Sequence, residues 1–376
     1  MIGDGGVLRV LHILNELRPS GAEVMLRTSG RLWRQQGVQS DILATGERVG
    51  SFTADLRAAG FTVHHLPFSP APAHFRAVRR LVIAGNYQVV HVHTERASFY
   101  YGLTALSVPG TTVVRTIHNV FAFRGTLRAK RLLQRALLRA GGVRSISVGA
   151  GVQANERERF LLPTTHIPNW VDTGCFTPPS DAVRSAARAR FGIGSDDVFV
   201  VVSVGNCNPV KNHAATFRAL SAWDEGFEWC YLHAGEEDPD GSERRLADEL
   251  GIAGQCRFLG FVPDVAALLH AGDVYVMPSL HEGASIAALE ALATGLPCVL
   301  ASSPGLDDLR QTIDRGIIWV EPSPAGVHRG LSEAAALGGS ASRGSRAALH
   351  EEVERHHGLS VGPGRYLDVY EQARSR

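Results

Sequence analysis

The sequence predicts a two-domain α/β protein in which each domain is a Rossmann-like, doubly wound parallel sheet. Short β-branched runs alternate with helix-like stretches, the alternation breaks at residues 167–180, and it then resumes. Such alternation produces right-handed βαβ units, in which helices cover both faces of a parallel sheet. At 376 residues the chain is long enough for two such domains, each with its own hydrophobic core.

The first half of the chain carries the elements of one such domain. Each predicted strand is a short run rich in Val, Ile, Leu and Thr, and a helical stretch follows each run. The predicted strands cover residues 8–14, 40–44, 62–66, 89–93, 112–116 and 144–148. The predicted helices cover residues 22–36, 52–59, 75–84, 97–106, 127–140 and 149–158.

The break at 167–180 is rich in Pro and polar residues, which is typical of an interdomain linker. Tyr366, Leu367, Val369 and Tyr370 recur at helical spacing near the end of the chain. The strands predicted after the break cover residues 198–204, 228–233, 257–259, 274–277, 298–301 and 317–320. The expected division is an N-terminal domain at 1–172, a C-terminal domain at 173–362, and a helix at 363–376 that packs back on the N-terminal domain.

Composition excludes several classes of function. The net charge of +1 gives no general attraction to nucleic acid, so we expect no nucleic-acid partner. The five cysteines are odd in number and widely spaced without a C-x-x-C pair, which argues against a disulfide framework and a zinc site. Residues 198–204 form the longest strongly apolar run, far short of a membrane span, and no signal peptide is apparent. We therefore expect a cytoplasmic protein.

The most informative stretch is residues 279–297, which contains Glu282 and Glu290. Glu282 lies on a Gly-containing loop after the strand at 274–277, and Glu290 lies on the helix that follows. Ligands bind at the carboxyl ends of strands in open parallel sheets, and a helix N-terminus there attracts anions. The helix around Glu290 is almost wholly apolar, so its carboxylate is either half buried or bound to a ligand. The pattern predicts a site for a polar, phosphate-bearing ligand.

The chain resembles the retaining nucleotide-sugar glycosyltransferases of family 4. The glutamate pair is the most specific part of the resemblance, and the loop from Val204 to Lys211 adds to it. Weaker matches are Pro-Ser-Gly-Ala-Glu at 19–23, Arg-Thr-Ile-His-Asn at 115–119, Pro-Asn-Trp-Val-Asp at 168–172 and Phe-Leu-Gly-Phe-Val at 258–262. The resemblance implies a GT-B fold, with two Rossmann-like domains facing across a cleft and the donor held by the C-terminal domain.

The resemblance also implies roles for individual residues. Glu290 would accept hydrogen bonds from the ribose hydroxyls of the donor, which suits a carboxylate. Lys211 and the helix N-terminal amides would neutralise the diphosphate as it leaves, without a metal or other cofactor. The remaining donor contacts would come from Gly21, from Glu282, Gly283, Ala284 and Ser285 beside the sugar and diphosphate, and from the backbone of Gly260, Phe261 and Val262 at the base.

Two further positions bear on catalysis. His118 matches the family's histidine near the donor sugar, and we expect it to orient a hydroxyl or assist proton transfer from the acceptor. Asn206 stands where the family usually has an arginine, which removes one positive charge from the leaving-group site. His91 and His93 share one face of a strand, but no carboxylate or cysteine completes a metal site there, so we expect none.

Residues 124–144 contain seven basic residues, several leucines and no acidic residue. This pattern is typical of a basic amphipathic helix. It is explained either by ordinary core packing with a solvated basic face, or by contact with an anionic membrane or an anionic acceptor.

The sequence therefore predicts a retaining, metal-independent hexosyl or N-acetylhexosaminyl transferase with catalytic residues His118, Glu282 and Lys211. A UDP-sugar is the expected donor, and a glycan, a lipid-linked molecule or a small molecule supplies the acceptor hydroxyl. One alternative is a nucleotide-sugar epimerase of the same fold. Another is a nucleotide-sugar-binding protein that has lost catalysis, which the presence of Asn206 would fit.

Overall fold

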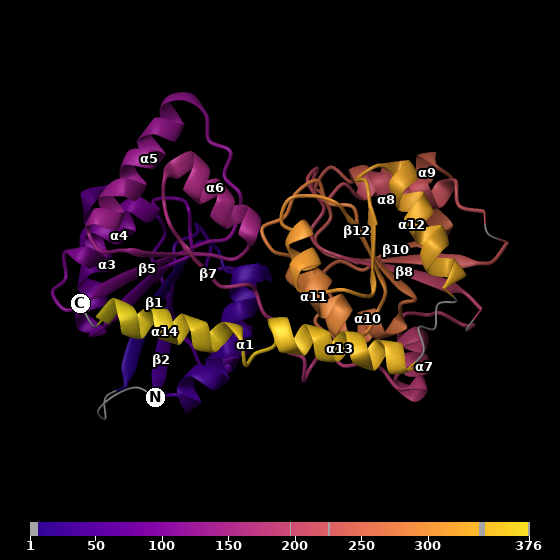
Figure 1. Ribbon diagram of the computed structural model, residues 1–376, viewed down its shortest axis with the longest axis horizontal. Coiled ribbons are helices and arrows are strands. Elements are labelled where there is room, and N and C mark those ends of the chain that lie inside the picture. Colours follow the sequence, from indigo (N-terminus) through magenta and orange to yellow (C-terminus); the bar gives the residue numbers. More distant parts are fainter. Residues whose placement is uncertain (1–6, 196, 225, 338–342, 375–376) are drawn as a thin grey trace. The chain divides into compact units, whose positions relative to one another are not determined.

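A computed structural model describes residues 7–195, 197–224, 226–337 and 343–374, with only the backbone at Arg343. The described chain forms two compact α/β units (Figure 1). The first comprises residues 7–170 and 359–374, and the second comprises the described residues of 171–358.

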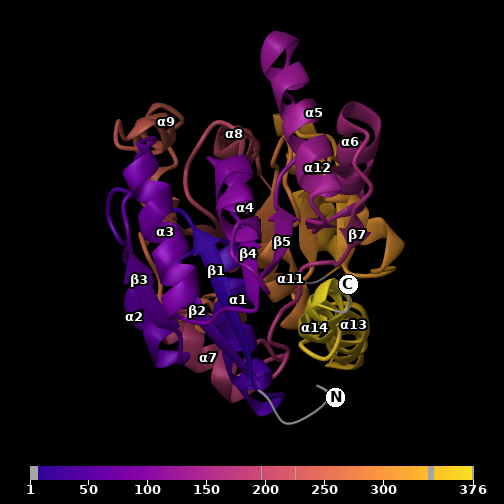
Figure 2. The ribbon, with the colours of Figure 1, turned by 90° about the vertical axis from the view of Figure 1, so that its left-hand side faces the viewer.

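The first unit contains a seven-stranded parallel sheet in the order β3-β2-β1-β4-β5-β6-β7 (Figure 2). Its interior strand β1 (Leu8–Leu14) is buried along nearly its whole length, as expected for a strand covered by helices on both faces. The other strands are β2 (Val38–Ala44), β3 (Thr62–His65), β4 (Val89–Val92), β5 (Thr112–Ile117), β6 (Arg144–Ser147) and β7 (Thr165–His166). The helices are α1 (Gly21–Gln35), α2 (Thr53–Ala58), α3 (Pro72–Ala84), α4 (Ser98–Leu106), α5 (Gly125–Ala140) and α6 (Ala150–Phe160).

The C-terminal helix α14 (Gly362–Arg374) belongs to the first unit, where it packs against β5 and α1. Trp33 of α1 donates a hydrogen bond from Nε1 to the backbone oxygen of Pro363 at 3.1 Å. A Cβ at Gly362 would come within 2.0 Å of the Trp170 ring, so only glycine allows this close approach.

The second unit contains a six-stranded parallel sheet in the order β10-β9-β8-β11-β12-β13. Along β8 (Phe199–Val204), Val200 and Val202 pack into one hydrophobic cluster while Phe199 and Val201 pack into another, which shows that both faces are covered. The other strands are β9 (Trp229–Ala234), β10 (Cys256–Phe258), β11 (Val274–Met277), β12 (Cys298–Ala301) and β13 (Ile317–Val320). The helices are α7 (Asp181–Arg190), α8 (His213–Ser221), α9 (Ser242–Glu249), α10 (Val265–Ala271), α11 (Ile286–Ala293), α12 (Pro324–Ala336) and α13 (Arg343–His357), with short 3-10 turns at Ala253–Gln255 and Asp307–Gln311.

The predicted class, two Rossmann-like domains with parallel sheets, is confirmed by these two sheets. Within the described ranges, every helix is too short or too polar to cross a lipid bilayer.

Candidate functional site

The loop after β8 is held by two closely packed glycines. Gly205 has a φ of +147° and Gly235, which follows β9, has a φ of +153°. A Cβ at Gly235 would come within 2.2 Å of the Gly205 oxygen, and a Cβ at Gly205 would lie 3.5 Å from Nζ of Lys211. The two glycines therefore allow the loop to fold back so that the Lys211 side chain lies over the backbone of Gly205.

Lys211 forms an ion pair with Glu282. Its Nζ donates a hydrogen bond to Oε1 of Glu282 at 2.8 Å, and the two side chains are 22% and 13% exposed. The loop that carries Glu282 is fixed by a backbone hydrogen bond from its N–H to the oxygen of Pro304 at 2.9 Å. A Cβ at Gly305 would come within 2.2 Å of the backbone oxygen of Glu282, so Gly305 is also required for this packing.

Helix α11 begins directly after this loop. Ser285 is its N-cap, with Oγ accepting a hydrogen bond from the backbone N–H of Ala288 at 3.3 Å. The first N–H groups of a helix have no partner within the helix, and the helix dipole places partial positive charge there. Lys211, Glu282 and this helix start therefore meet at the carboxyl end of the sheet, as the sequence predicts.

Glu290 lies on α11 and is 8% exposed. Its burial is compatible with both expectations from the sequence, a half-buried carboxylate or one that binds a ligand. Burial is the main cause of the raised pKa of the Tyr275 hydroxyl, and the charges of Glu282 and Glu290 raise it further. Tyr275 in turn donates a hydrogen bond to the oxygen of Val204 at 3.4 Å. Both carboxylates thus lie close enough to act on one phenol at the end of β8.

The remaining predicted residues of the second unit lie at neighbouring strand ends. The carboxamide oxygen of Asn206 accepts a hydrogen bond from the N–H of Glu236 at 2.9 Å, which braces the loop. Gly260 accepts a backbone hydrogen bond from Gly235 at 2.9 Å, and its φ is +61°. Phe261 is 57% exposed, whereas Val262 packs against the hydrophobic core.

Gly21 and His118 belong to the first unit. Gly21 is the first residue of α1, two positions before the buried Glu23. Burial raises the pKa of Glu23 to about 7, and Ser20 donates a hydrogen bond to its carboxylate, which fixes the turn. His118 directly follows β5 and is partly buried.

His118 is the end of a chain of hydrogen-bonded imidazoles. Its Nε2 lies 3.1 Å from Nδ1 of His93, and Nε2 of His93 lies 3.1 Å from Nδ1 of His12. A neutral imidazole has one donor and one acceptor nitrogen, so the proton position on His12 and His93 determines the tautomer of His118. The sequence places these histidines near strand ends, but it does not show that they touch.

The fourth histidine of this region, His91, has hydroxyl groups as its hydrogen-bond partners. Its two ring nitrogens lie 2.7 Å from the hydroxyls of Tyr370 and Thr116. His91, His93 and His12 lie close enough to share an ion, but both nitrogens of His91 and of His93 already have hydrogen-bond partners. The hydroxyl partners of His91 argue against metal binding by that residue, whereas Nε2 of His12 has no hydrogen-bond partner among the described residues.

We expect the first unit to lose stability as the pH falls below about 6.5. Burial lowers the pKa of His118 to about 4 and that of His12 to about 3, and it places the pKa of His93 well below its usual value. Between the folded and unfolded pKa values only the unfolded chain takes up the proton, so each such histidine costs about 1.4 kcal/mol per pH unit. Urea unfolding at pH 7.5, 6.5 and 5.5, followed by hydrogen exchange in the first unit, measures this slope.

The variant His93→Gln is expected to make that slope shallower, because it removes one of the buried titrating groups. His65→Gln is the matched control, since His65 is exposed. An unfolding free energy that stays constant from pH 7.5 to 5.5, or a slope that His93→Gln leaves unchanged, contradicts the expectation.

Several residues that complete the geometry were not predicted as part of the site. Tyr275 lies within an apolar strand, and Gly235 and Gly305 lie in loops distant in sequence from the loops that they contact. A glycine directly after a predicted strand is the one signal that could have pointed to Gly235.

Two family models match the chain. Residues 19–175 match the model described as Glycosyltransferase Family 4, and residues 185–350 match that described as Glycosyl transferases group 1. The chain is 28% identical over 324 residues to a Bacillus subtilis protein named as a glycosyltransferase, EpsF, with 82% of each chain covered.

It is also 26% identical over 239 residues to an Escherichia coli enzyme named UDP-Gal:alpha-D-GlcNAc-diphosphoundecaprenol alpha-1,3-galactosyltransferase, with 60% of each covered. Among solved structures, HepE of Anabaena, crystallised with UDP and glucose, superposes with a TM-score of 0.83 at 16% identity. That superposition covers 97% of this chain and 100% of HepE. The predicted GT-B fold is confirmed by such neighbours.

Proposed function

Because the chain belongs to glycosyltransferase family 4, whose members are retaining enzymes that use nucleotide sugars, we propose that it transfers a hexosyl or N-acetylhexosaminyl group from a UDP-sugar to an acceptor hydroxyl. The observation that carries the proposal is the Lys211–Glu282 pair at the start of α11, with Glu290 buried on the same helix. The UDP complex of HepE and the UDP-galactose-using E. coli relative support the choice of nucleotide.

In the proposed mechanism the second unit positions the donor and stabilises its leaving group. Glu290 accepts hydrogen bonds from the ribose, and the backbone of residues 260–262 contacts the base. Lys211 exchanges its pairing with Glu282 for contact with the diphosphate, and the amides at the start of α11 share the developing negative charge. Most of the rate enhancement then comes from positioning and electrostatic stabilisation, without a metal at the diphosphate.

At the reacting centre, the acceptor hydroxyl attacks from the side on which the diphosphate leaves, so the anomeric configuration is retained. Glu282 contacts the donor sugar and does not act as a covalent nucleophile. His118 accepts a hydrogen bond from a sugar hydroxyl or from the acceptor. Its lowered pKa keeps the imidazole neutral at pH 7, which leaves one ring nitrogen able to accept a proton.

A thermal-shift panel of nucleosides, nucleoside diphosphates and nucleotide sugars tests the proposal, because a ligand that binds the folded state raises Tm according to its affinity. We expect selective stabilisation by UDP and by one UDP-sugar. Equal or absent shifts across the panel would contradict donor binding. Selective stabilisation by another nucleoside diphosphate would show that the donor carries a different base, and it would leave the rest of the proposal intact.

A protein that binds nucleotide sugars without catalysis is the second candidate function, because Asn206 supplies no positive charge and its oxygen is engaged by Glu236. Donor binding and sugar transfer, measured for the wild type and for Asn206→Arg, distinguish a transferase from such a binding protein. Donor binding without transfer in both proteins favours the binding protein. Conversion of the free donor to an isomer, in the absence of any acceptor, would instead identify an epimerase.

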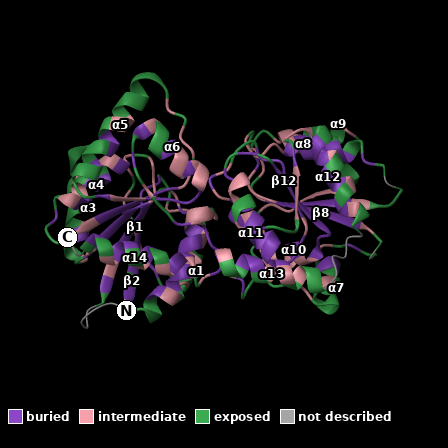
Figure 3. Cartoon of the chain, in the orientation of Figure 1, coloured by how far each residue is buried: buried purple, intermediate pink, exposed green. Residues whose placement is uncertain are grey.

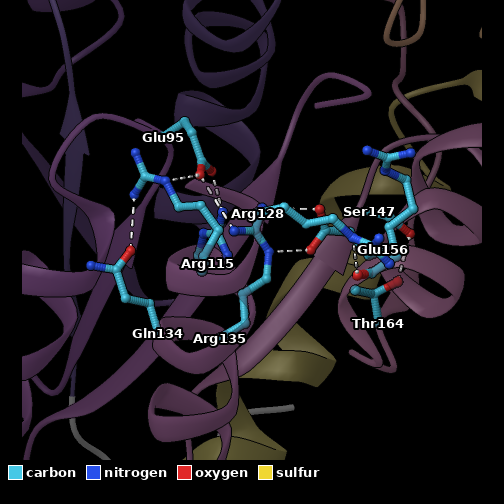
Figure 4. A network of polar contacts seen from close by, with 10 residues as sticks. Glu95, Arg115, Arg128, Gln134, Arg135, Ser147, Glu156 and Thr164 are labelled. Atoms are coloured by element: carbon cyan, nitrogen blue, oxygen red, sulfur yellow. Dashed lines mark hydrogen bonds and ion pairs between the residues drawn. The ribbon is translucent and has the colours of Figure 1, made fainter. Parts of the chain in front are cut away.

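Residues 124–144, which contain seven basic residues, form a less basic surface than this composition suggests. Helix α5 ends at Ala140, and Arg144 lies on β6. Arg135 is buried, with Nε donating to a Glu156 carboxylate oxygen at 2.6 Å and Nη2 to the other at 3.0 Å (Figure 4). Arg131 lies 3.8 Å from a carboxylate oxygen of Glu95. These two arginines therefore stabilise the first unit and do not contribute to an outward basic face.

Much of helix α5 is exposed (Figure 3), and its exposed residues include both leucines and cations. Leu127, Leu133 and Leu137 are 45%, 58% and 48% exposed, and Lys130 and Arg139 are also exposed. Exposed apolar and basic side chains on one helix favour peripheral binding to an anionic membrane. We therefore propose that α5 contacts a membrane that carries a lipid-linked acceptor, such as the one in the name of the E. coli relative.

Flotation with vesicles tests this contact at low salt. We expect the wild type to float with vesicles that contain phosphatidylglycerol and not with pure phosphatidylcholine. Lys130→Glu combined with Leu133→Ser is expected to weaken flotation, whereas Arg355→Glu on α13 serves as an exposed-charge control. The absence of binding to anionic vesicles at low salt would remove the membrane proposal and leave the transferase proposal unaffected.

A further inference from the structure

A cluster of metal-ligand side chains lies at the base of the loop that carries Lys211. Cys207 and His213 lie on either side of Lys211 in that loop region, and His233 comes from the neighbouring strand β9. One ligand atom from each of the three lies within 4.8 Å of the others, and all three residues are buried. Sγ of Cys207 lies 3.3 Å from Nε2 of His233. Ligand atoms around tetrahedral zinc are separated by roughly 3.3–3.8 Å, as its bond lengths imply.

His213 is the member that ordinary packing does not explain. It is 5% exposed, yet neither of its ring nitrogens has a hydrogen-bond partner among the described residues. A buried polar group without a partner is costly, and native structures avoid it unless a ligand is present. The ring centroid of His213 lies 4.6 Å from that of His233, so its unpaired nitrogens lie beside the cluster.

The backbone next to His213 is firmly held. Asn212 precedes it with a φ of +55°, and its Nδ2 donates hydrogen bonds to the oxygens of Pro278 and Pro322, each at 3.1 Å. These two contacts tie the end of the loop to the strand ends of the sheet. The position of His213 is thus set by the fold.

His233 is oriented as metal-binding histidines are. Its Nδ1 lies 2.8 Å from Oγ of Ser203, which in turn lies 2.6 Å from the hydroxyl of Tyr231. A hydrogen bond at the second ring nitrogen fixes the tautomer and directs the other nitrogen toward the ion. Here that other nitrogen is Nε2, which is directed toward Cys207.

The set of donors indicates which ion would bind. One thiolate and two imidazoles suit Zn²⁺ and related divalent transition metals, whereas Mg²⁺ and Ca²⁺ prefer oxygen ligands. In the histidine cluster of the first unit, by contrast, both ring nitrogens of His91 are held by hydroxyls that lie outside the cluster.

We propose that Cys207, His213 and His233 bind one Zn²⁺ ion, which fixes the Lys211 loop to the sheet. Binding releases the thiol proton of Cys207 to solvent and joins both ends of the loop to β9. The ion contacts no part of the donor, so transfer itself remains free of metal chemistry. The effect on Lys211 rests on the proposed function, whereas the metal site itself does not.

Metal analysis of the purified full-length chain tests the site. After removal of metals with EDTA, incubation with Zn²⁺ and buffer exchange, we expect about one equivalent of zinc by mass spectrometry. Co²⁺ in place of Zn²⁺ is expected to give a thiolate charge-transfer band. Cys207→Ser should abolish the band and His213→Gln should weaken it, whereas Cys256→Ser, on the adjacent strand β10, should leave it unchanged.

Failure of the wild type to retain zinc, or a Co²⁺ band that Cys207→Ser leaves unchanged, overturns the proposal. Circular dichroism identifies any variant that does not fold. If a variant does not fold, zinc retention by the wild type alone decides whether the proposal stands. UDP affinity, measured with and without Zn²⁺, tests the role of the loop separately. We expect tighter UDP binding with zinc, and equal affinities would overturn the role of the ion in fixing Lys211. Zinc binding without any nucleotide binding would contradict the proposed function and leave the metal site standing.

Discussion

Glu290→Ala is expected to lower the affinity for uridine and for UDP alike, by at least about 100-fold. The ribose is common to both ligands, and its vicinal hydroxyls can each donate a hydrogen bond to the carboxylate. A hydrogen bond to a charged group contributes about 1.5–3 kcal/mol, and each 1.4 kcal/mol changes Kd tenfold. The low exposure of Glu290 strengthens the effect, because few waters remain to replace the lost contact. Isothermal titration calorimetry with both ligands measures the change.

Two variants control for indirect effects of this substitution. Glu290→Gln keeps the shape of the side chain and should bind with intermediate affinity, since its amide has a single acceptor oxygen. Glu351→Ala removes an exposed glutamate from α13 and should bind as the wild type does. Wild-type affinity in folded Glu290→Ala would show that the ribose is held elsewhere.

Lys211→Ala is expected to weaken the binding of UDP but not that of uridine. It should weaken UDP binding by about 10- to 100-fold, the effect of one charged hydrogen bond, and leave uridine binding unchanged. In the ligand-free protein Lys211 lies 2.8 Å from Glu282, so a diphosphate must compete with that carboxylate. Glu282→Gln should therefore strengthen UDP binding modestly. Calorimetric titrations of the two variants with UDP and uridine separate the contributions.

Lys130 is the natural control for this experiment, because it is the chain's other lysine and lies exposed on α5. Lys130→Ala should bind UDP and uridine as the wild type does. Equal losses of UDP and uridine affinity in Lys211→Ala would indicate a collapsed loop and argue against a direct contact with the diphosphate.

Most strands could be predicted from sequence because central strands of a parallel sheet are continuous apolar runs. The range predicted for β1 is the observed Leu8–Leu14, and β11 and β12 also match. β7 was missed because it consists of two exposed residues, Thr165 and His166, whose pairing with β6 leaves no hydrophobic signal.

The candidate site could be predicted only in part, for a similar reason. Lys211 and Glu282 each lie on a loop that follows a readable strand, and the sheet brings such loops together. The close approach of Gly305 to Glu282, and the clustering of Cys207 with His213 and His233, join segments that are distant in sequence. The spacing of the cysteines could not indicate this cluster, because two of its three side chains are histidines. Arg135 looked like part of a basic surface because its partner Glu156 lies on the next helix.

The central claim is that Glu290 receives the ribose hydroxyls of the nucleotide, and a cycle of protein and ligand changes tests it most directly. Calorimetry would compare uridine with 2′,3′-dideoxyuridine on the wild type and on Glu290→Ala. We predict that loss of the hydroxyls weakens binding to the wild type by about 100-fold, as two charge-assisted hydrogen bonds imply, and has little effect on the variant. If the variant discriminates between the two ligands as strongly as the wild type does, Glu290 does not contact the ribose and the account is wrong.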